Sequence, residues 1–330
     1  MDSLLPPYPV IHEQLLKGQV IPFLGAGASL TIRSPKKAPW RKMINKKTGE
    51  WEVSYLPTAY ELAEYLAQQS KFPEKEPIEL AKVAQYFDSM VGSKLLYERL
   101  HEIFNHDHPY TSLHNYLAGL PRPLLIVTTN YDDLIERAFK KKGRPFDLVV
   151  HTTDPTMGDE LLWWPARANE PDRVLAKDLD IDLDRTTIIY KMHGAVNRTK
   201  RDGGQFVITE DDYIDFLARM TTSSAIPNIF GEPFQTRPFL FLGYGLYDWN
   251  LRVVLNRIEK QFRRPRAIVS WAIQRSVKAM ERDLWSARGV RVFDQDLQDF
   301  VENIQTPKAR PRKRPKTKPT TRKTGTKRRR

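Results

Sequence analysis

Polar side chains follow directly after an apolar run near the middle of the sequence. The run Pro123–Ile126 leads into VTTNYDD, which supplies Thr129, Asn130 and Asp132. Such side chains cost free energy when they are buried without partners, so a helix N-terminus or a ligand must use them. Asn and Asp are ordinary helix N-cap residues. The segment by itself therefore leaves both a helix cap and a ligand contact open.

Two glycine pairs end other apolar runs. The run 19–24 leads into GAGAS at 25–29, and the run 237–242 leads into GYG at 243–245. Glycines would let the backbone amides of the first turn approach a phosphate. That turn lacks the third glycine of a dinucleotide-binding fingerprint, so a tight turn without a ligand is an equal alternative. No GxxxxGK[ST] motif is present, which argues against an ATPase.

His193 follows the apolar run 186–192 and precedes Gly194. A histidine at the end of a strand could act as a base near neutral pH. Considered alone, such a histidine is more often a partly buried residue that bonds to the backbone. A second group of histidines follows no familiar metal-ligand spacing, and we predict no metal site there. Its members are His101, His106, His108 and His114.

Strand and helix signals alternate along residues 19–293. This alternation predicts an α/β fold with a Rossmann-like, mostly parallel sheet that carries helices on both faces. In such sheets ligands bind beyond the carboxyl ends of the strands. The polar and glycine-containing segments all follow strand signals, so we expect them at one edge of the sheet.

Local signals predict several boundaries. Thr58 and Glu61 form a capping-box pattern before a helix. Gly143 is placed as the C-terminal stop of another helix. We predict one domain over residues 1–305, with a helical subdomain inserted at about 55–120.

Two less regular stretches complete this domain. Residues 152–184 lose the alternation and are predicted as an acidic, proline-containing connection. FVIT at 206–209 is predicted as a strand, with Thr209 as the cap of the following helix.

The composition excludes several classes of protein. The chain has 330 residues, of which 40% are hydrophobic and 28% charged, as in globular proteins. It has no cysteine, which excludes disulfides and thiolate metal sites. No apolar run approaches the roughly 20 residues of a membrane helix, and the first residues lack a signal-peptide pattern. We therefore expect a cytoplasmic protein that does not associate with membranes.

The net charge of +13 is confined to one segment. Residues 308–330 contain 13 of the 53 basic residues and no acidic one, which leaves 40 basic and 40 acidic side chains in residues 1–307. We predict that 306–330 is a disordered basic tail. It could bind nucleic acid without sequence preference, or serve only as a solubilising or address-like segment.

In this order, the four segments resemble motifs of the sirtuin superfamily. GAGAS is similar to the sirtuin GAG-[IV]-S phosphate loop, TTNYD to the sirtuin TQNID, and KMHG to the strand that ends in the catalytic histidine. The phrases AKVAQYF, TTNYDDLIE, FVITEDDY and FLGYGLYDWNLR resemble the bacterial sirtuin-like domains more closely than the deacylases. The resemblance covers roughly residues 15–295.

Three departures from the sirtuin pattern matter. Deacylating sirtuins generally carry a zinc module built on four cysteines, whereas this chain has none. Their phosphate loop usually continues into a PDFR-like segment, where this chain has SLTIRSPKKAPW. GYG stands in place of G-[TS]-S, so Gly245 lacks the serine hydroxyl expected near the adenosine ribose.

The resemblance implies that NAD is the substrate, that no zinc is bound, and that the nicotinamide–ribose bond is broken. Asn130 would hold a ribose hydroxyl or the attacking water, His193 would take a proton, and Asp132 would orient the loop or the ribose. The implied NAD-binding residues are Gly25, Ala26, Gly27, Ser29, Thr129, Gly243, Tyr244 and Gly245.

With water as acceptor, such a protein is an NAD glycohydrolase. The alternatives are an NAD-dependent protein deacylase and a non-catalytic sensor of NAD or ADP-ribose. The resemblance is to the antiphage-defence branch, whose members deplete NAD when a partner senses infection. It implies a homo-oligomer and a HerA-type DNA translocase as partner, which fits a short stand-alone chain better than an Argonaute-like protein does.

Overall fold

The computed structural model describes most of the chain before residue 306, and the predicted basic tail lies outside the described residues. The described ranges are 5–31, 40, 43–44, 51–52, 55–74, 79–152, 157–197, 205–222, 226–245, 249–262, 265 and 267–305.

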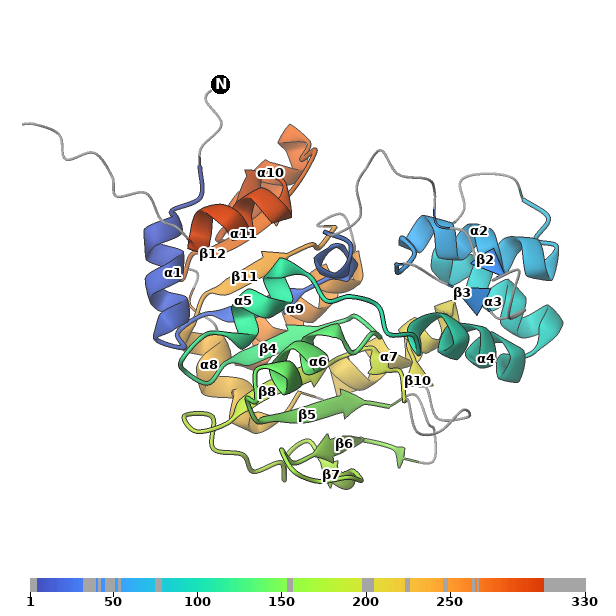
Figure 1. Ribbon diagram of the computed structural model, residues 1–330, viewed down its shortest axis with the longest axis horizontal. Helices are drawn as coiled ribbons and strands as arrows, with labels where there is room; N and C mark the ends of the chain where they lie inside the picture. The colour runs from blue at the N-terminus through green and yellow to red at the C-terminus, as the bar shows by residue number, and fades with distance from the viewer. Residues whose placement is uncertain are drawn as a thin grey trace, which may run out of the picture.

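A nine-stranded sheet forms the centre of the described structure (Figure 1). Its strand order is β13-β12-β11-β1-β4-β8-β5-β6-β7. Every neighbouring pair from β13 to β5 is parallel, while β6 and β7 extend one edge in antiparallel fashion. The strands are β1 (Ile21–Leu24), β4 (Leu125–Thr128), β5 (Phe146–His151), β6 (Glu160–Trp164), β7 (Asp172–Leu175), β8 (Thr187–Lys191), β11 (Phe239–Leu242), β12 (Ser270–Gln274) and β13 (Val290–Asp294). The predicted α/β class with a mostly parallel sheet is confirmed.

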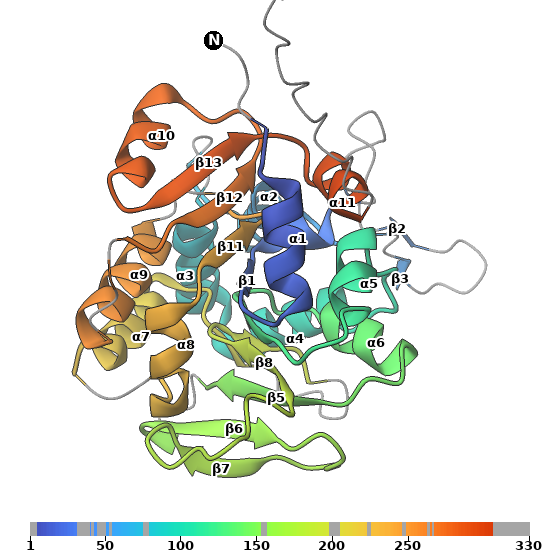
Figure 2. The same ribbon diagram turned by 90° about the vertical axis from the view of Figure 1, so that its left-hand side faces the viewer.

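Helices cover both faces of the sheet (Figure 2). Side chains of neighbouring strand residues point to opposite faces, so Phe23 and Leu24 enter different hydrophobic cores. The core that includes Phe23 is covered by α7 (Glu210–Thr222), α8 (Gly231–Thr236), α9 (Trp249–Gln261) and α10 (Ala279–Ser286). The core that includes Leu24 is covered by α1 (Tyr8–Leu16), α5 (Ser112–Ala118), α6 (Leu134–Lys141) and α11 (Leu297–Gln305).

Three further helices form a separate lobe beyond the carboxyl ends of the strands (Figure 1). This helical lobe comprises α2 (Ala59–Ser70), α3 (Leu80–Val91) and α4 (Ser93–Phe104), beside the short hairpin β2 (Met43–Ile44) and β3 (Trp51–Glu52). It has its own hydrophobic core, which also includes Leu134, Val196 and Phe206 from segments that follow β4 and β8. The lobe therefore packs against the loops at the edge where the candidate site was expected.

The lobe corresponds to most of the predicted insertion. The capping box is present before α2, because Thr58 accepts the Glu61 N–H and the Glu61 side chain accepts the Thr58 N–H. The insertion was predicted to extend to about residue 120, whereas α5 packs on the sheet with α6 and α11 rather than in the lobe.

Two sequence predictions about the later strands are wrong. Residues 152–184, predicted as a connection, contain β6 and β7. Of the predicted strand at 206–209, only Phe206 is paired, in β10 (Gln205–Phe206) against β9 (Gly194–Ala195). The predicted C-terminal stop and N-terminal cap are confirmed: Gly143 has a φ of +63° after α6, and the Thr209 hydroxyl accepts the Asp212 N–H at the start of α7. Within the described ranges, no helix is both long and apolar enough to cross a membrane.

Candidate functional site

The four segments predicted to carry chemistry follow four adjacent strands. The sheet places β11, β1, β4 and β8 side by side, all parallel. Leu24 pairs with Leu242 on one side and with Thr128 on the other, and Thr128 pairs with Lys191. The residues after these positions therefore leave the sheet at one edge, beneath the helical lobe.

The two glycine-containing turns at this edge interlock. The Gly27 N–H donates to the Gly243 carbonyl at 2.9 Å, and the Gly25 N–H donates to the Leu242 carbonyl at 3.0 Å. Gly243 has a φ of +69°, and a Cβ on it would lie 2.1 Å from the Ala28 nitrogen. The contact between the turns thus requires glycine. The Gly25 and Gly27 amides, which were expected to approach a phosphate, are therefore bonded within the protein. Ala26 is exposed, and its N–H has no acceptor among the described residues.

Asn130 connects the β4 loop to the first glycine turn. Its Nδ2 donates to the Gly25 carbonyl at 3.0 Å and lies 3.3 Å from the Ser29 hydroxyl. Its backbone N–H donates to the Thr128 hydroxyl at 3.0 Å. The side chain is half-buried, and its Oδ1 receives no hydrogen bond from the described residues. That oxygen is an acceptor that a ligand hydroxyl could use.

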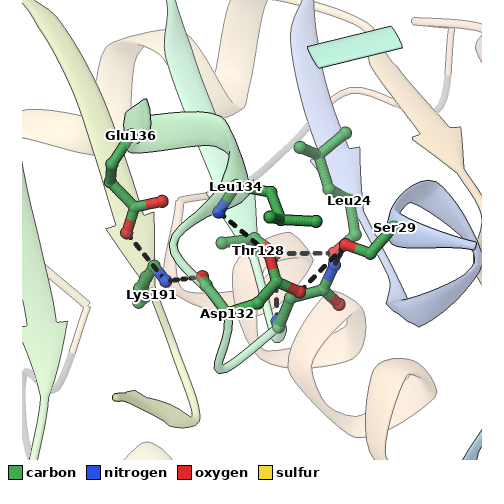
Figure 3. A network of polar contacts seen from close by, with 8 residues as sticks. Leu24, Ser29, Thr128, Asp132, Leu134, Glu136 and Lys191 are labelled. Atoms are coloured by element: carbon green, nitrogen blue, oxygen red, sulfur yellow. Dashed lines mark hydrogen bonds and ion pairs between the residues drawn. The ribbon is translucent and has the colours of Figure 1, made fainter. Parts of the chain in front are cut away.

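Asp132 lies deeper, and its carboxylate bonds within the protein. One oxygen accepts the Ser29 hydroxyl at 2.9 Å, and the other accepts the Leu134 N–H at 3.1 Å (Figure 3). The second bond satisfies an amide at the start of α6. Ser29 is also buried. The carboxylate thus joins the GAGAS turn to α6, and the helix-start interpretation of the polar segment holds for this residue.

Thr129 and Tyr244 meet on the other side of the GAGAS turn. Their hydroxyls lie 3.1 Å apart. The Tyr244 ring packs edge-on against Phe23 at 5.5 Å and lies close to Gly25, where a Cβ would be 2.7 Å from a ring carbon. Gly245 follows as a half-buried residue. The GYG segment therefore places an aromatic ring against the first glycine turn.

His193 is buried against α7. Its ring packs edge-on against Tyr213 at 5.5 Å and Phe216 at 5.0 Å. Its Nε2 is buried and has no hydrogen-bond partner among the described residues. Burial lowers the pKa of His193 to about 3, so the imidazole is neutral at physiological pH. An unpartnered polar atom in a buried position is unusual and identifies an atom that a ligand could satisfy.

The structure brings Asn130 and His193 to adjacent strand ends but gives them different partners. Each lies two residues beyond the paired positions Thr128 and Lys191. Asn130 bonds to the GAGAS turn, whereas His193 packs on α7. Tyr131 connects the two segments, because its hydroxyl donates to the Val207 carbonyl at 2.6 Å and the Val207 N–H donates to the His193 carbonyl at 3.0 Å.

The histidine group at 101–114 is bonded within the protein. His101 and His108 bond to the backbone carbonyls of Asn197 and Ile103, and His114 closes the capping box of α5 with Thr111. The described part of the chain contains no group of three or more His, Asp or Glu side chains placed to hold a metal ion.

One cavity of the described structure lies away from these residues. It has a volume of about 830 Å³ and is lined by residues before β1, β4 and β11, among them Gly18, Pro123 and Pro238. Those residues mark the amino-terminal edge of the parallel strands, opposite to the candidate site. Because ligands of such sheets bind at the carboxyl ends, we assign the site by its side chains rather than by this cavity.

One buried pair at the site was missed by the sequence analysis. Lys191, the last residue of β8, forms an ion pair with Glu136 of α6 at 2.8 Å and donates to the Asp132 backbone carbonyl (Figure 3). The available signal was a lysine inside an otherwise apolar strand, where charged side chains are rare unless they are paired.

Taken together, this edge offers a neutral imidazole, the amide oxygen of the half-buried Asn130 and the backbone N–H of the exposed residue Ala26. Such groups can hydrogen-bond hydroxyls and water, and a neutral imidazole can take a proton. A strongly anionic reaction centre would use unpaired cationic side chains, whereas the cation described at this edge, Lys191, is already paired with Glu136. The arrangement suits chemistry at a sugar better than transfer of a phosphoryl group.

Comparison with known proteins connects this site to a family. The SIR2-like domain family matches residues 124–293. Defense-associated sirtuin 2 of Bacillus subtilis is 24% identical over 250 residues, which are 76% of this chain and 20% of that protein.

Two NAD(+) hydrolases named ThsA are also similar. The protein of Bacillus cereus (strain MSX-D12) is 25% identical over 260 residues, which cover 77% of this chain and 48% of that protein. The protein of Cytobacillus dafuensis is 28% identical over 185 residues, covering 56% and 31%. The chain thus spans less than half the length of each of these three relatives, and its relationship to the NAD(+) hydrolases is distant.

Proposed function

Because this chain belongs to the SIR2-like domain family, we propose that it is an NAD+ glycohydrolase, which cleaves NAD to nicotinamide and ADP-ribose. The observation that carries the proposal is the placement of Asn130 and His193. Both residues lie two positions beyond paired residues on adjacent parallel strands, and the GAGAS turn follows the next strand. The distant relationship to the ThsA NAD(+) hydrolases supports the same reaction.

In this reaction water adds to the anomeric carbon of the ribose and the bond to nicotinamide breaks. In NAD the nicotinamide ring is a pyridinium cation, so it leaves as neutral nicotinamide and needs no general acid. The attacking water, in contrast, must lose a proton. The ribose develops oxocarbenium character during the step. Asn130 Oδ1 would accept a hydrogen bond from a ribose hydroxyl or from the water.

His193 would accept the proton that the water loses. Before substrate binds, burial holds its pKa at about 3, which makes it a weak base. The negative diphosphate of NAD would favour the protonated imidazole and raise the pKa of His193 toward neutral pH, where a base is most effective. NAD enters as substrate in this proposal, and the Ala26 N–H together with Ser29, Thr129 and the GYG turn would face its diphosphate and ribose.

Release of nicotinamide from NAD, measured by chromatography, tests the proposal. We expect Asn130→Ala and His193→Ala each to lower kcat/KM by at least about 100-fold, the usual range for removal of a positioned polar or acid–base group. Asn228→Ala serves as a matched control, since Asn228 is exposed and lies outside the site. Release by both site variants at the wild-type rate would exclude this site as the source of the activity, and no release by the wild-type chain would exclude the hydrolase.

A sensor of NAD or ADP-ribose is the second candidate, and the weak basicity of the buried His193 favours it over a deacylase. Binding of ADP-ribose by a chain that releases no nicotinamide would support the sensor. A deacylase would instead remove acetyl groups from a lysine peptide in an NAD-dependent reaction. The absence of cysteine argues against the zinc module of that class.

We also propose a role in antiphage defence, in which the chain depletes NAD when a partner signals infection. Similarity to the protein named Defense-associated sirtuin 2 supports this role. A homo-oligomer working with a HerA-type DNA translocase is the preferred assembly, with an Argonaute-like partner as the alternative. The basic residues 308–330 would contact nucleic acid, and unchanged DNA affinity at several salt concentrations after their deletion would exclude that contact.

A further inference from the structure

A buried ion pair lies beneath the loop that carries Asn130. The side chains of Lys191 and Glu136 are 1% and 6% exposed, and their Nζ and Oε1 atoms are 2.8 Å apart. Removing two charges from water is unfavourable, and well-packed apolar residues often stabilise a core as well or better. A gain in folding stability therefore does not explain the buried Lys191–Glu136 pair, which indicates a functional role for it.

The lysine also holds the loop. Its Nζ donates to the backbone carbonyl of Asp132 as well as to Glu136. The Asp132 carboxylate accepts the Ser29 hydroxyl (Figure 3). That hydroxyl lies 3.3 Å from Asn130 Nδ2. A continuous set of polar contacts thus runs from Glu136 through Lys191 and Asp132 to the amide of Asn130.

Glu136 makes this use of lysine possible. It lies in the first turn of α6, where the helix dipole favours an anion and disfavours a lone cation. Burial raises the pKa of Glu136, and the Lys191 ammonium opposes that rise. The second carboxylate oxygen has no hydrogen-bond partner among the described residues, so Lys191 is the charged partner that this carboxylate serves.

We propose that Lys191 and Glu136 are positioning residues, which fix the 129–133 loop so that the Asn130 amide meets the ribose of the substrate. The inference rests on the proposed function, and it assigns to this site two residues that need not touch NAD. A displacement of about 1 Å in a reacting group can cost about 100-fold in rate. Loss of the lysine contact should therefore lower kcat far more than it changes KM.

The test uses Lys191→Met, the double variant Lys191→Met/Glu136→Leu, and Lys191→Arg. The single Met variant leaves an unpaired buried carboxylate and should be unstable, whereas the double variant removes both charges and should fold. We expect the folded double variant to lose about 100-fold in kcat with KM changed less than about threefold. Arginine keeps the positive charge and carries enough N–H donors for both the carboxylate and the loop carbonyl, so Lys191→Arg should keep at least about a third of the wild-type kcat.

The exposed pair Lys17–Glu13 provides the matched control. Its side chains are 56% and 67% exposed, and Lys17→Met/Glu13→Leu should leave kcat unchanged. Hydrogen exchange of the 129–133 amides without ligand should be faster in the double variant than in the wild type or this control. Wild-type kcat in the folded double variant, or a Lys191→Arg variant as slow as the double variant, overturns the proposal.

The same variants separate this inference from the proposed function. If the wild-type chain binds ADP-ribose but releases no nicotinamide, the hydrolase proposal is excluded. The positioning role of Lys191 and Glu136 is then tested by the affinity for ADP-ribose. The double variant should then bind ADP-ribose about tenfold more weakly, and equal affinity overturns the role. A wild-type chain that neither binds ADP-ribose nor releases nicotinamide overturns both.

Discussion

Gly243 has the tightest surroundings of the glycines at the candidate site. A side-chain carbon there would lie 2.1 Å from the Ala28 nitrogen and 2.5 Å from the Gly27 carbonyl carbon, both of them backbone atoms. Backbone atoms cannot move aside as a flexible side chain can. The φ of +69° adds a conformational cost for any other L-residue.

Gly243→Ala should therefore destabilise the fold by more than about 3 kcal/mol. Gly143→Ala isolates the conformational part of this cost, because Gly143 has a similar φ of +63° and no atom within 4 Å of the added carbon. We expect about 1 kcal/mol for that control. Urea unfolding of both variants measures the difference, and equal losses would show that the contact between the turns can relax.

The residue types at the site could be predicted from the sequence, but their partners could not. Asn130 and His193 were recognised because each follows an apolar run and matches a family motif. The rings around His193 belong to Tyr213 and Phe216, which lie some twenty residues further along the chain, on α7. Contacts between elements of this kind depend on packing, which local sequence patterns do not encode.

At the scale of elements, the helical lobe depends on how its helices begin. Thr58 and Glu61 exchange two hydrogen bonds at the start of α2, with donor–acceptor distances of 3.2 and 2.9 Å. The Glu61 carboxylate also accepts the Trp40 N–H at 2.6 Å. The cap therefore connects α2 to a second segment of the lobe.

Thr58→Ala should cost about 1 kcal/mol, the usual value for loss of an N-cap side chain. The loss should appear as faster hydrogen exchange in α2 and as a lower urea midpoint. Thr236→Ala is the control, because the exposed Thr236 hydroxyl bonds only within α8, and its free energy of unfolding should change by less than about 0.5 kcal/mol. No change in α2 exchange would contradict the predicted role of the cap.

Elements with strong local signals were predicted, and those without them were not. The α2 cap and the Gly143 stop are encoded within a few residues. The strands β6 and β7 were missed because β7 is mostly exposed and lacks an apolar run, and because both pair in antiparallel fashion at the sheet edge. Their existence depends on β5, which offers a free edge only in the folded sheet.

At the scale of the whole molecule, stability should depend on pH through buried histidines. Burial lowers the pKa of His114 to about 4 and the pKa values of His151 and His193 to about 3. The pKa of His108 is also lowered, again mainly by burial. In the unfolded chain these groups titrate near 6.5.

The direction in which stability changes with pH follows from which state, folded or unfolded, binds more protons. Above pH 6.5 the histidines are neutral in both states, and stability is at its full value. Between about pH 6.5 and 4 the unfolded chain binds protons that the folded chain excludes, so stability falls as the pH falls, by about 1.4 kcal/mol per pH unit for each histidine. Glu136 acts in the opposite direction, since its pKa is raised on folding.

Urea unfolding between pH 7.5 and 5 tests this expectation. Below about pH 6, the slope of the free energy of unfolding against pH should correspond to the uptake of roughly three protons on unfolding. His151→Gln should reduce that number by about one. His151 is suitable because its ring bonds to the Tyr190 hydroxyl and no contact with the substrate is proposed for it. Stability that stays constant from pH 7.5 to 5 would contradict burial of these rings in the neutral form.

The interlock between the GAGAS and GYG turns limits how this site can be exchanged between relatives. A Cβ on Gly243 would collide with the backbone of the first turn. The two turns, residues 25–29 and 243–245, are therefore compatible only as a matched set, although more than two hundred positions separate them. A chimera that imports one turn from another SIR2-like domain must import the other with it. Grafting of either turn alone would produce a steric clash with the backbone of the other turn and destabilise the chimera, so ligand specificity could not be measured.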